Sequence, residues 1–220
     1  MGNLISGQNS RLPRKAYLGM EFVLVFIFLP VCLRVYLPGR FLLPLLWIAA
    51  ILCLTWLWHK PTFKRSELWS FSRQDQNVFR ILARFIILAV IIGIFVTRFA
   101  PNQLFHLIQA RPALWLLIML LYPVLSVYPQ GIVYRSFIFN RYCDLFSTPP
   151  IMIIASAIAF AMVHLVFGNL LAMGLSFVGG VIFAQTYRRT KSLAVSSMEH
   201  ALYGCFLFTI GLGTYFYHGQ

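Results

Sequence analysis

Acidic residues are scarce in this chain. Of its 220 residues only 5 are Asp or Glu, against 18 Lys or Arg, and charged residues together make up 10% of the whole. Because soluble domains carry about 25% charged residues, this composition excludes an ordinary soluble domain. The basic residues punctuate long apolar stretches, so the net charge of +13 favours an anionic lipid surface over nucleic acid as the partner.

Cysteine is equally sparse, and its spacing forms no motif. The chain has 4 cysteines, with neither a CxxC pair nor the spacing of a zinc site. They are Cys32, Cys53, Cys143 and Cys205, and all but Cys143 lie within apolar runs. We interpret them as small core side chains rather than as metal ligands or disulfide partners.

Long apolar stretches fill most of the sequence. Hydrophobic residues amount to 60%, and about 20 consecutive apolar residues suffice for a helix to cross a bilayer. The predicted fold class is therefore all-α, a polytopic bundle of about seven transmembrane helices. The candidate spans are Tyr17–Tyr36, Phe41–Trp58, Ile81–Phe99, Leu114–Tyr142, Pro150–Phe167, Leu170–Tyr187 and Leu193–Tyr217.

The distribution of basic residues predicts the orientation of this bundle. With a cytoplasmic N-terminus, only 4 of the 18 Lys and Arg residues fall outside, as the positive-inside rule requires. They are Arg34, Arg40, Arg98 and Arg111. We expect a basic cytoplasmic tail over residues 1–15, N-terminal transmembrane helices with a basic loop over 16–113, and a core over 114–217. The expected location is a cell's inner or plasma membrane.

Two of the predicted spans contain residues that predict their local geometry or packing. The fourth contains Pro123 and Pro129, which predict a kink or a break into two helices. The sixth has small residues at four-residue spacing, namely Ser176, Gly180 and Ala184. Small residues on one helical face let a neighbouring backbone approach closely, so this face predicts tight helix packing.

Four polar residues interrupt the apolar stretches: Gln130, Arg135, His164 and His200. A charged side chain at the centre of a membrane helix costs about 2.5–3.5 kcal/mol, so such residues commonly serve a function. At about 1.5 Å of rise per residue, their depths from the predicted cytoplasmic helix ends overlap, from about 10 Å for Arg135 to about 21 Å for His164. We expect all four to line one cavity.

Simpler interpretations exist for each of these residues alone. A single buried histidine usually hydrogen-bonds a group on a neighbouring helix, and Arg135 could snorkel to the cytoplasmic face. Glu199 is adjacent to His200 and therefore points about 100° away from it on a helix. For this reason Glu199 is not expected in the same site.

The order of the polar residues resembles that of the CAAX-protease and bacteriocin-processing family of intramembrane peptidases, also called the Abi family. Its members carry Glu-Glu-x-x-x-Arg, Phe-x-x-x-His and His-x-x-x-Asn on separate transmembrane helices. The matching segments here are Gln130-Gly131-Ile132-Val133-Tyr134-Arg135, Phe160-Ala161-Met162-Val163-His164 and His200-Ala201-Leu202-Tyr203-Gly204. The resemblance covers residues 114–217 and implies catalytic positions at Gln130, Gly131, Arg135, His164 and His200.

The sequence departs from this pattern at the acidic positions. As the resemblance implies, a glutamate and a histidine activate the attacking water, and a later histidine with an asparagine stabilises the oxyanion. Gln130 and Gly131 replace both glutamates, and Gly204 replaces the asparagine. Since a neutral amide cannot accept a proton near neutral pH, His164 or His200 would have to act as the base.

Three functions fit the pattern. The first is an intramembrane endopeptidase acting near the cytoplasmic side on a membrane-associated or prenyl-like peptide. The second is a non-catalytic relative that keeps the cavity for binding or immunity, and the third is a bis-histidine haem or proton-handling membrane protein. A divalent metal such as zinc would have His164 and His200 as its ligands, although catalytic zinc usually has three protein ligands. The pattern leaves metal content open.

Overall fold

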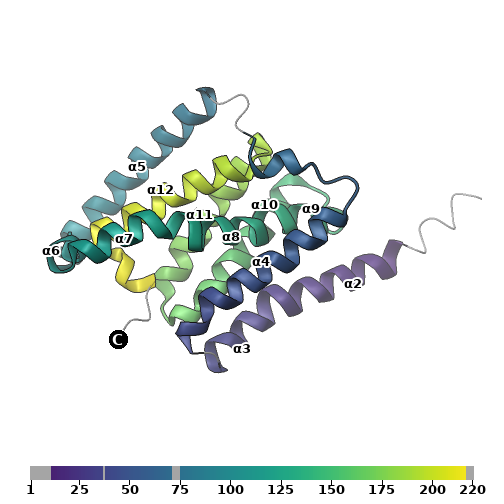
Figure 1. Ribbon diagram of the computed structural model, residues 1–220, viewed down its shortest axis with the longest axis horizontal. Helices are drawn as coiled ribbons and strands as arrows, with labels where there is room; N and C mark the ends of the chain where they lie inside the picture. Colours follow the sequence, from purple (N-terminus) through teal and green to yellow (C-terminus); the bar gives the residue numbers. More distant parts are fainter. Residues whose placement is uncertain (1–10, 37, 71–74, 217–220) are drawn as a thin grey trace, which may run out of the picture.

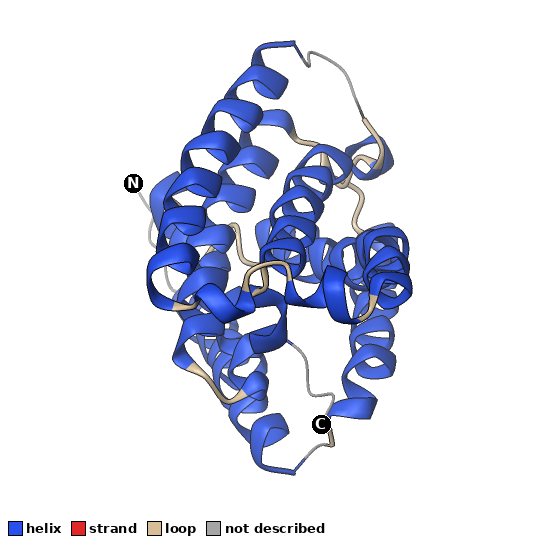
Figure 2. Cartoon of the chain, turned by 90° about the vertical axis from the view of Figure 1, so that its left-hand side faces the viewer, coloured by secondary structure: helices blue, strands red, loops and turns tan. Residues whose placement is uncertain are grey.

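The computed structural model describes residues 11–36, 38–70 and 75–216, and these residues form helices joined by short loops, with no strand among them (Figure 2). Seven helical segments are long and apolar enough to cross a membrane, which confirms the all-α transmembrane bundle. Residues 1–10, most of the tail predicted over residues 1–15, lie outside the described residues. The side of the membrane that each end faces stays a prediction.

The N-terminal spans, within residues 13–99, are three in number. The first runs through α2 (Arg11–Val23), the π-helical segment η1 (Leu24–Phe28) and α3 (Leu29–Tyr36). The turn η2 (Gly39–Phe41) leads into the second, α4 (Leu42–His59). A loop containing η3 (Arg65–Leu68) precedes the third, α5 (Asp75–Phe99). The first helix is already formed ahead of the predicted Tyr17, and the side chains of Arg14 and Lys15 are exposed there.

The C-terminal core, within residues 112–210, begins with one long span. After η4 (Pro101–Gln103) and α6 (His106–Ala110), the chain passes without interruption through α7 (Pro112–Tyr122), η5 (Pro123–Val127), α8 (Tyr128–Gly131), η6 (Ile132–Phe137) and α9 (Ile138–Arg141). Pro123 opens the π-helical segment η5 instead of breaking the helix. A π-helical turn is a common adjustment where the regular hydrogen-bond ladder is interrupted, so the span stays continuous.

Three further spans complete the core. The fifth combines α10 (Pro149–Val163) with η7 (His164–Phe167), the sixth is α11 (Leu170–Thr190), and the seventh is α12 (Leu193–Ile210), followed by η8 (Leu212–Phe216). The seventh ends before the predicted Tyr217 because Gly211 adopts a φ of 108°, a left-handed conformation that stops an α-helix and favours glycine.

The helices of the core lie at the centre of the molecule. In Figure 1, α8, α10, α11 and α12 occupy the middle, with α2 and α5 on opposite sides. α10 and α11 approach closely because Gly180 carries no side chain: a Cβ there would lie 2.9 Å from the Cα of Ala157. The small-residue face predicted in the sixth span is thus a packing face.

Every acidic side chain that the structure describes joins an N-terminal segment to the C-terminal core. The four connections are Glu199 to Arg84, Glu21 to Arg141 and Tyr142, Glu67 to Tyr187, and Asp144 to Arg14. The four described carboxylates therefore serve as links that tie the first span, the loop at η3 and the third span to the core.

Candidate functional site

Three of the four predicted polar residues meet at the ring of Phe160. The guanidinium carbon of Arg135 lies 4.2 Å from the centroid of that ring. The ring centroids of His164 and His200 lie 4.7 Å and 5.3 Å from it. The fourth, fifth and seventh spans each contribute a polar residue to this group. We call Phe160, Arg135, His164 and His200 the Phe160 cluster.

His164 is placed by the residue one helical turn before it. Its Nδ1 lies 2.7 Å from the carbonyl oxygen of Phe160, at the point where α10 passes into η7. Because a carbonyl oxygen only accepts hydrogen bonds, Nδ1 carries the proton and Nε2 holds the lone pair. The Phe-x-x-x-His spacing in the sequence produces this contact, and it orients His164 as a proton acceptor.

His200 is held by two aromatic residues that the sequence analysis did not identify. Its Nε2 lies 3.3 Å from the hydroxyl oxygen of Tyr122, and its ring stacks on Phe183 with centroids 4.6 Å apart. Gly204 makes room for this arrangement, since a Cβ there would lie 2.3 Å from the Tyr122 hydroxyl oxygen. Tyr122 thus fills the space that an asparagine at position 204 would enter.

Arg135 is enclosed without a hydrogen-bond partner among the described residues. Arg135 is only 1% exposed, and its Nε, Nη1 and Nη2 all lack an acceptor. The rings of Phe160 and Phe183 lie 4.2 Å and 5.4 Å from the guanidinium carbon. Such cation–π contacts favour the positive charge, but they supply no acceptor to the N–H groups. The snorkelling interpretation is therefore wrong.

Gln130 and Gly131 occupy the two positions at which the family pattern has glutamate. The Gln130 Nε2 donates to the Ser126 hydroxyl at 2.7 Å, while its Oε1 is buried without a partner in the described part of the chain. None of these contacts joins Gln130 to the Phe160 cluster, so one cavity shared by all four predicted residues stays a prediction. A Cβ on Gly131 would lie 2.8 Å from both Leu193 Cδ1 and Ser197 Oγ.

Glu199 is the acidic residue nearest to the cluster in sequence, and it is engaged elsewhere. Its Oε1 accepts a hydrogen bond from Arg84 Nη2 at 2.6 Å, and the same nitrogen lies 2.9 Å from the Thr186 hydroxyl oxygen. The adjacent position predicted that Glu199 would point away from His200, and its contacts agree. The three other described carboxylates also bond outside the cluster.

The donor set at the cluster does not fit a divalent metal. Among the described residues there is no group of three or more His, Cys, Asp or Glu that could hold one. His164 and His200 alone fall short of the three protein ligands usual for catalytic zinc. The guanidinium of Arg135 lies against the same phenylalanine ring and would repel a cation.

The packing of the two histidines also leaves no slot for a haem at their shared face. A bis-histidine haem needs a flat opening between its two axial ligands. Here both histidine rings pack against Phe160, and His200 stacks on Phe183 as well. This packing argues against a haem held between His164 and His200.

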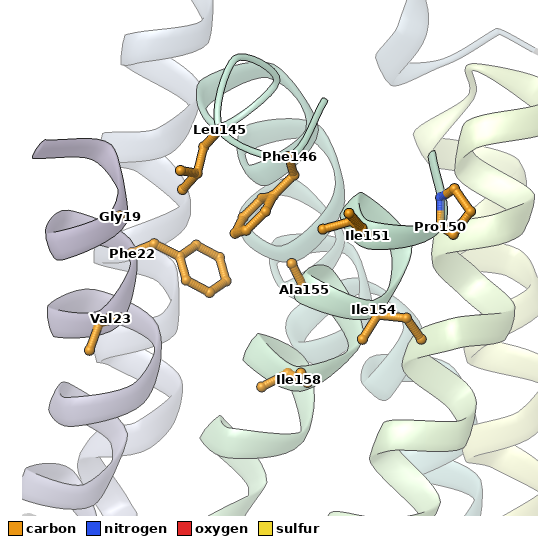
Figure 3. Close-up of a pocket in the computed structure, with 10 residues that line it drawn as sticks. All are labelled: Gly19, Phe22, Val23, Leu145, Phe146, Pro150, Ile151, Ile154, Ala155 and Ile158. Carbon is orange, nitrogen blue, oxygen red and sulfur yellow. The ribbon is translucent and has the colours of Figure 1, made fainter. Parts of the chain in front are cut away.

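A separate cavity of about 530 Å³ lies between the first span and α10 (Figure 3). Its lining is entirely apolar and includes Phe22, Phe146, Ile151 and Ala155. It shares no residue with the Phe160 cluster, and it offers no group for polar chemistry. The polar residues of the interior and this apolar cavity are thus distinct features of the molecule.

The fold and the cluster define a polytopic membrane protein with arginine and histidine side chains gathered inside a helical bundle. Residues 112–206 match the family described as type II CAAX prenyl endopeptidase Rce1-like. No curated protein and no solved structure matches the chain. This C-terminal region is thus similar to the CAAX-protease family of membrane peptidases, which confirms the resemblance in its motifs.

Proposed function

We propose that this protein binds a membrane-associated peptide at the Phe160 cluster and hydrolyses it far more slowly than relatives that carry the glutamate pair. The observation that supports the proposal is that the described carboxylates are bonded outside the Phe160 cluster. All four described ones link an N-terminal segment to the core, and the cluster itself holds only a guanidinium and two imidazoles as its polar groups.

Peptide hydrolysis needs a group that takes a proton from the attacking water. A positioned general base contributes about 10²- to 10⁴-fold to such a step, and neither Gln130 nor Gly131 can act as one. His164 is the residual base of this site, because its Nδ1 is bonded to the Phe160 carbonyl and its Nε2 is left to accept a proton. We therefore expect His164 to support slow turnover of the bound peptide.

The test uses the full chain reconstituted in lipid nanodiscs and a fluorescent, S-prenylated tetrapeptide. Anisotropy measures binding, and single-turnover kinetics measure cleavage. We expect binding with slow cleavage, and Gln130→Glu raises the cleavage rate by about 10²- to 10⁴-fold. Gln109→Glu is the matched control, because Gln109 lies exposed on α6 and should change nothing. His200→Ala should abolish the turnover that Gln130→Glu introduces.

Two results would contradict the proposal. If the unmodified chain cleaves briskly and Gln130→Glu adds nothing, a histidine suffices as the base and the protein is a full peptidase. If the peptide does not bind at all, the cluster is not a peptide site. Gly131→Glu is a poorer test than Gln130→Glu, since its Cβ would displace Leu193 and Ser197.

A further inference from the structure

The apolar cavity between the first span and α10 has a buried wall and an open rim (Figure 3). Phe22 and Ala155 in its lining are buried, whereas Val23, Ile151 and Ile154 are exposed. Because both helices belong to spans of a membrane protein, the exposed rim faces lipid. The cavity volume of about 530 Å³ lies within the range of about 300–1,000 Å³ that is usual for ligand sites. The cavity can therefore receive a molecule that enters from the bilayer.

The lining of this cavity fits an occupant that forms no hydrogen bonds. None of the ten lining residues has a polar side chain. A peptide would bring backbone N–H and C=O groups that stay unbonded against such a wall, which is strongly unfavourable inside a membrane. The hydrocarbon chain of a lipid carries no such groups, and each of its methylenes gains by burial. The cavity therefore suits a hydrocarbon chain better than a segment of protein.

A positive charge lies one helical turn from this cavity. Lys15 precedes the lining residue Gly19 by four positions on α2, so the two share a helical face about 6 Å apart along the helix axis. The membrane span begins at Pro13, which puts Lys15 in its first turn, at the level of lipid headgroups. The Lys15 side chain is exposed and forms no ion pair with a described carboxylate. Its ammonium group is therefore available to an anion.

The neighbouring carboxylates narrow the class of headgroup. Glu21 and Asp144 are each adjacent in sequence to a lining residue, but Glu21 is paired with Arg141 and Asp144 with Arg14. The ammonium group of a zwitterionic headgroup would thus find no free carboxylate here, whereas a phosphate finds the free ammonium group of Lys15. Basic residues beside a membrane span attract anionic lipids in this way. The charges near the cavity therefore favour an anionic headgroup.

We propose that this cavity binds one acyl chain of an anionic phospholipid and that the phosphate of the same lipid lies at Lys15. The apolar stem of the lysine would run along the helix while its ammonium group stays at the membrane surface, as is usual for lysine at such a depth. The cavity shares no lining residue with the Phe160 cluster. The proposal is therefore independent of the peptide binding proposed for that cluster.

The experiment uses the full chain in phosphatidylcholine nanodiscs and two photoreactive lipids. One is phosphatidylglycerol with a diazirine on an acyl chain, and the other is phosphatidylcholine with the same labelled chain. After photolysis, peptide mass spectrometry quantifies crosslinks to residues 19–23 and 150–158. We expect phosphatidylglycerol to label these residues about fivefold more than phosphatidylcholine does, as one basic group near a membrane surface implies. Lys15→Gln should reduce this ratio to about one.

Controls separate the headgroup contact from the filling of the cavity. Lys64→Gln changes an exposed lysine before η3 and should keep the full ratio. Gly19→Leu fills the cavity, and it starts without a clash because a Cβ there would meet only Leu145, at 3.9 Å. It should reduce crosslinks from both lipids roughly tenfold, through lost burial of methylenes. Gly174→Leu, where no atom lies within 4 Å of a Cβ, should leave both unchanged.

Four results would overturn the proposal. Equal labelling by the two lipids on the unmodified chain removes the anionic preference, and this comparison needs no variant to fold. A ratio that persists in Lys15→Gln assigns the phosphate to another group. Labelling spread evenly over all spans would show attraction to the membrane surface without a site. Displacement of both lipids from residues 19–23 by free S-farnesyl cysteine would assign the cavity to an isoprenoid chain instead.

Discussion

The two halves of this bundle are built differently. In the C-terminal core, 56% of the most apolar window is buried in both the fifth and the seventh span, whereas in the third span none of it is buried. The core helices pack on one another, and its fourth, fifth and seventh spans carry the Phe160 cluster. The N-terminal spans present most of their apolar side chains outward, where lipid covers them. Hydrophobicity alone therefore does not tell a core helix from a peripheral one in a membrane protein.

Polar links join the outer helices to the core, in addition to apolar packing such as that of Phe22 and Phe26 on Tyr142. Between lipid-exposed helices the hydrophobic effect gives no net attraction, because lipid is as apolar as leucine. The carboxylate links supply specific attachments instead, and they differ in burial. Removing a link should therefore lower the free energy of unfolding by less when its side chains are more exposed. Variants of three links test this order, together with one packing change in the core.

The largest effect is expected from Arg84→Met. The variant leaves the Glu199 carboxylate, whose side chain is 0% exposed, without its cation. Breaking a buried pair from one side costs about 3–5 kcal/mol, measured as the free energy of unfolding in detergent micelles. The double variant Arg84→Met with Glu199→Leu should recover most of this loss, because it leaves no buried charge. A single variant as stable as the unmodified chain would show that α5 is held by other contacts.

Gly204→Ala should have the next largest effect, inside the core. Its Cβ would meet the Tyr122 hydroxyl oxygen at 2.3 Å, and overpacking of this kind costs about 1–3 kcal/mol. Gly174→Ala is the matched control, because no atom lies within 4 Å of a Cβ there. That control should keep or slightly raise stability, since alanine favours a helix by about 0.8–1.0 kcal/mol over glycine. Equal responses of the two variants would contradict the close approach of Tyr122 to α12.

Glu21→Gln should cost less than either of these changes. Glu21 accepts hydrogen bonds from Arg141 at 2.9 Å and 2.6 Å and from Tyr142 at 2.8 Å, but the charged pair is 25% and 20% exposed. Water screens such a pair, so we expect a loss of about 1 kcal/mol. A double-mutant cycle with Arg141→Gln measures the coupling. Strictly additive losses would mean that the pair contributes nothing of its own.

Asp144→Asn should have the smallest effect. The pair of Asp144 with Arg14 has a distance of 2.9 Å, but its side chains are 50% and 69% exposed. Exposed pairs contribute about 0.2–1 kcal/mol, and we expect the lower end of that range at low salt and no difference in about 1 M salt. A loss of stability that persists at high salt would mean that water reaches this pair less than its exposed fractions indicate.

Much of the fold follows from hydropathy, and its local details do not. Apolar length predicts the seven spans, but the first helix already begins at Arg11 and the last α-helix ends at Ile210. The left-handed backbone of Gly211 decides the second of these ends. The π-helical segments η5 and η6 also shift the helical phase. Facing arguments based on a regular α-helix therefore hold less well in this span.

The Phe160 cluster was predictable in its polar members, and its aromatic surroundings were not. Overlapping depths suggested that Arg135, His164 and His200 would meet, and the structure brings them to one ring. Tyr122 and Phe183 carried no signal, because an aromatic residue in an apolar helix resembles any core residue. Arg84 and Glu199 are separated by 115 positions, so only the fold could pair them.

The space left by Gly204 has a consequence for engineering the family's motif into this sequence. Tyr122 fills the room that an asparagine at position 204 would need, so Gly204→Asn collides with the tyrosine ring. Leu193 and Ser197 obstruct Gly131→Glu in the same way. Each of these single substitutions therefore meets a clash that a second, smaller side chain at the neighbouring position would have to relieve, so the motif can be rebuilt here only by paired substitutions.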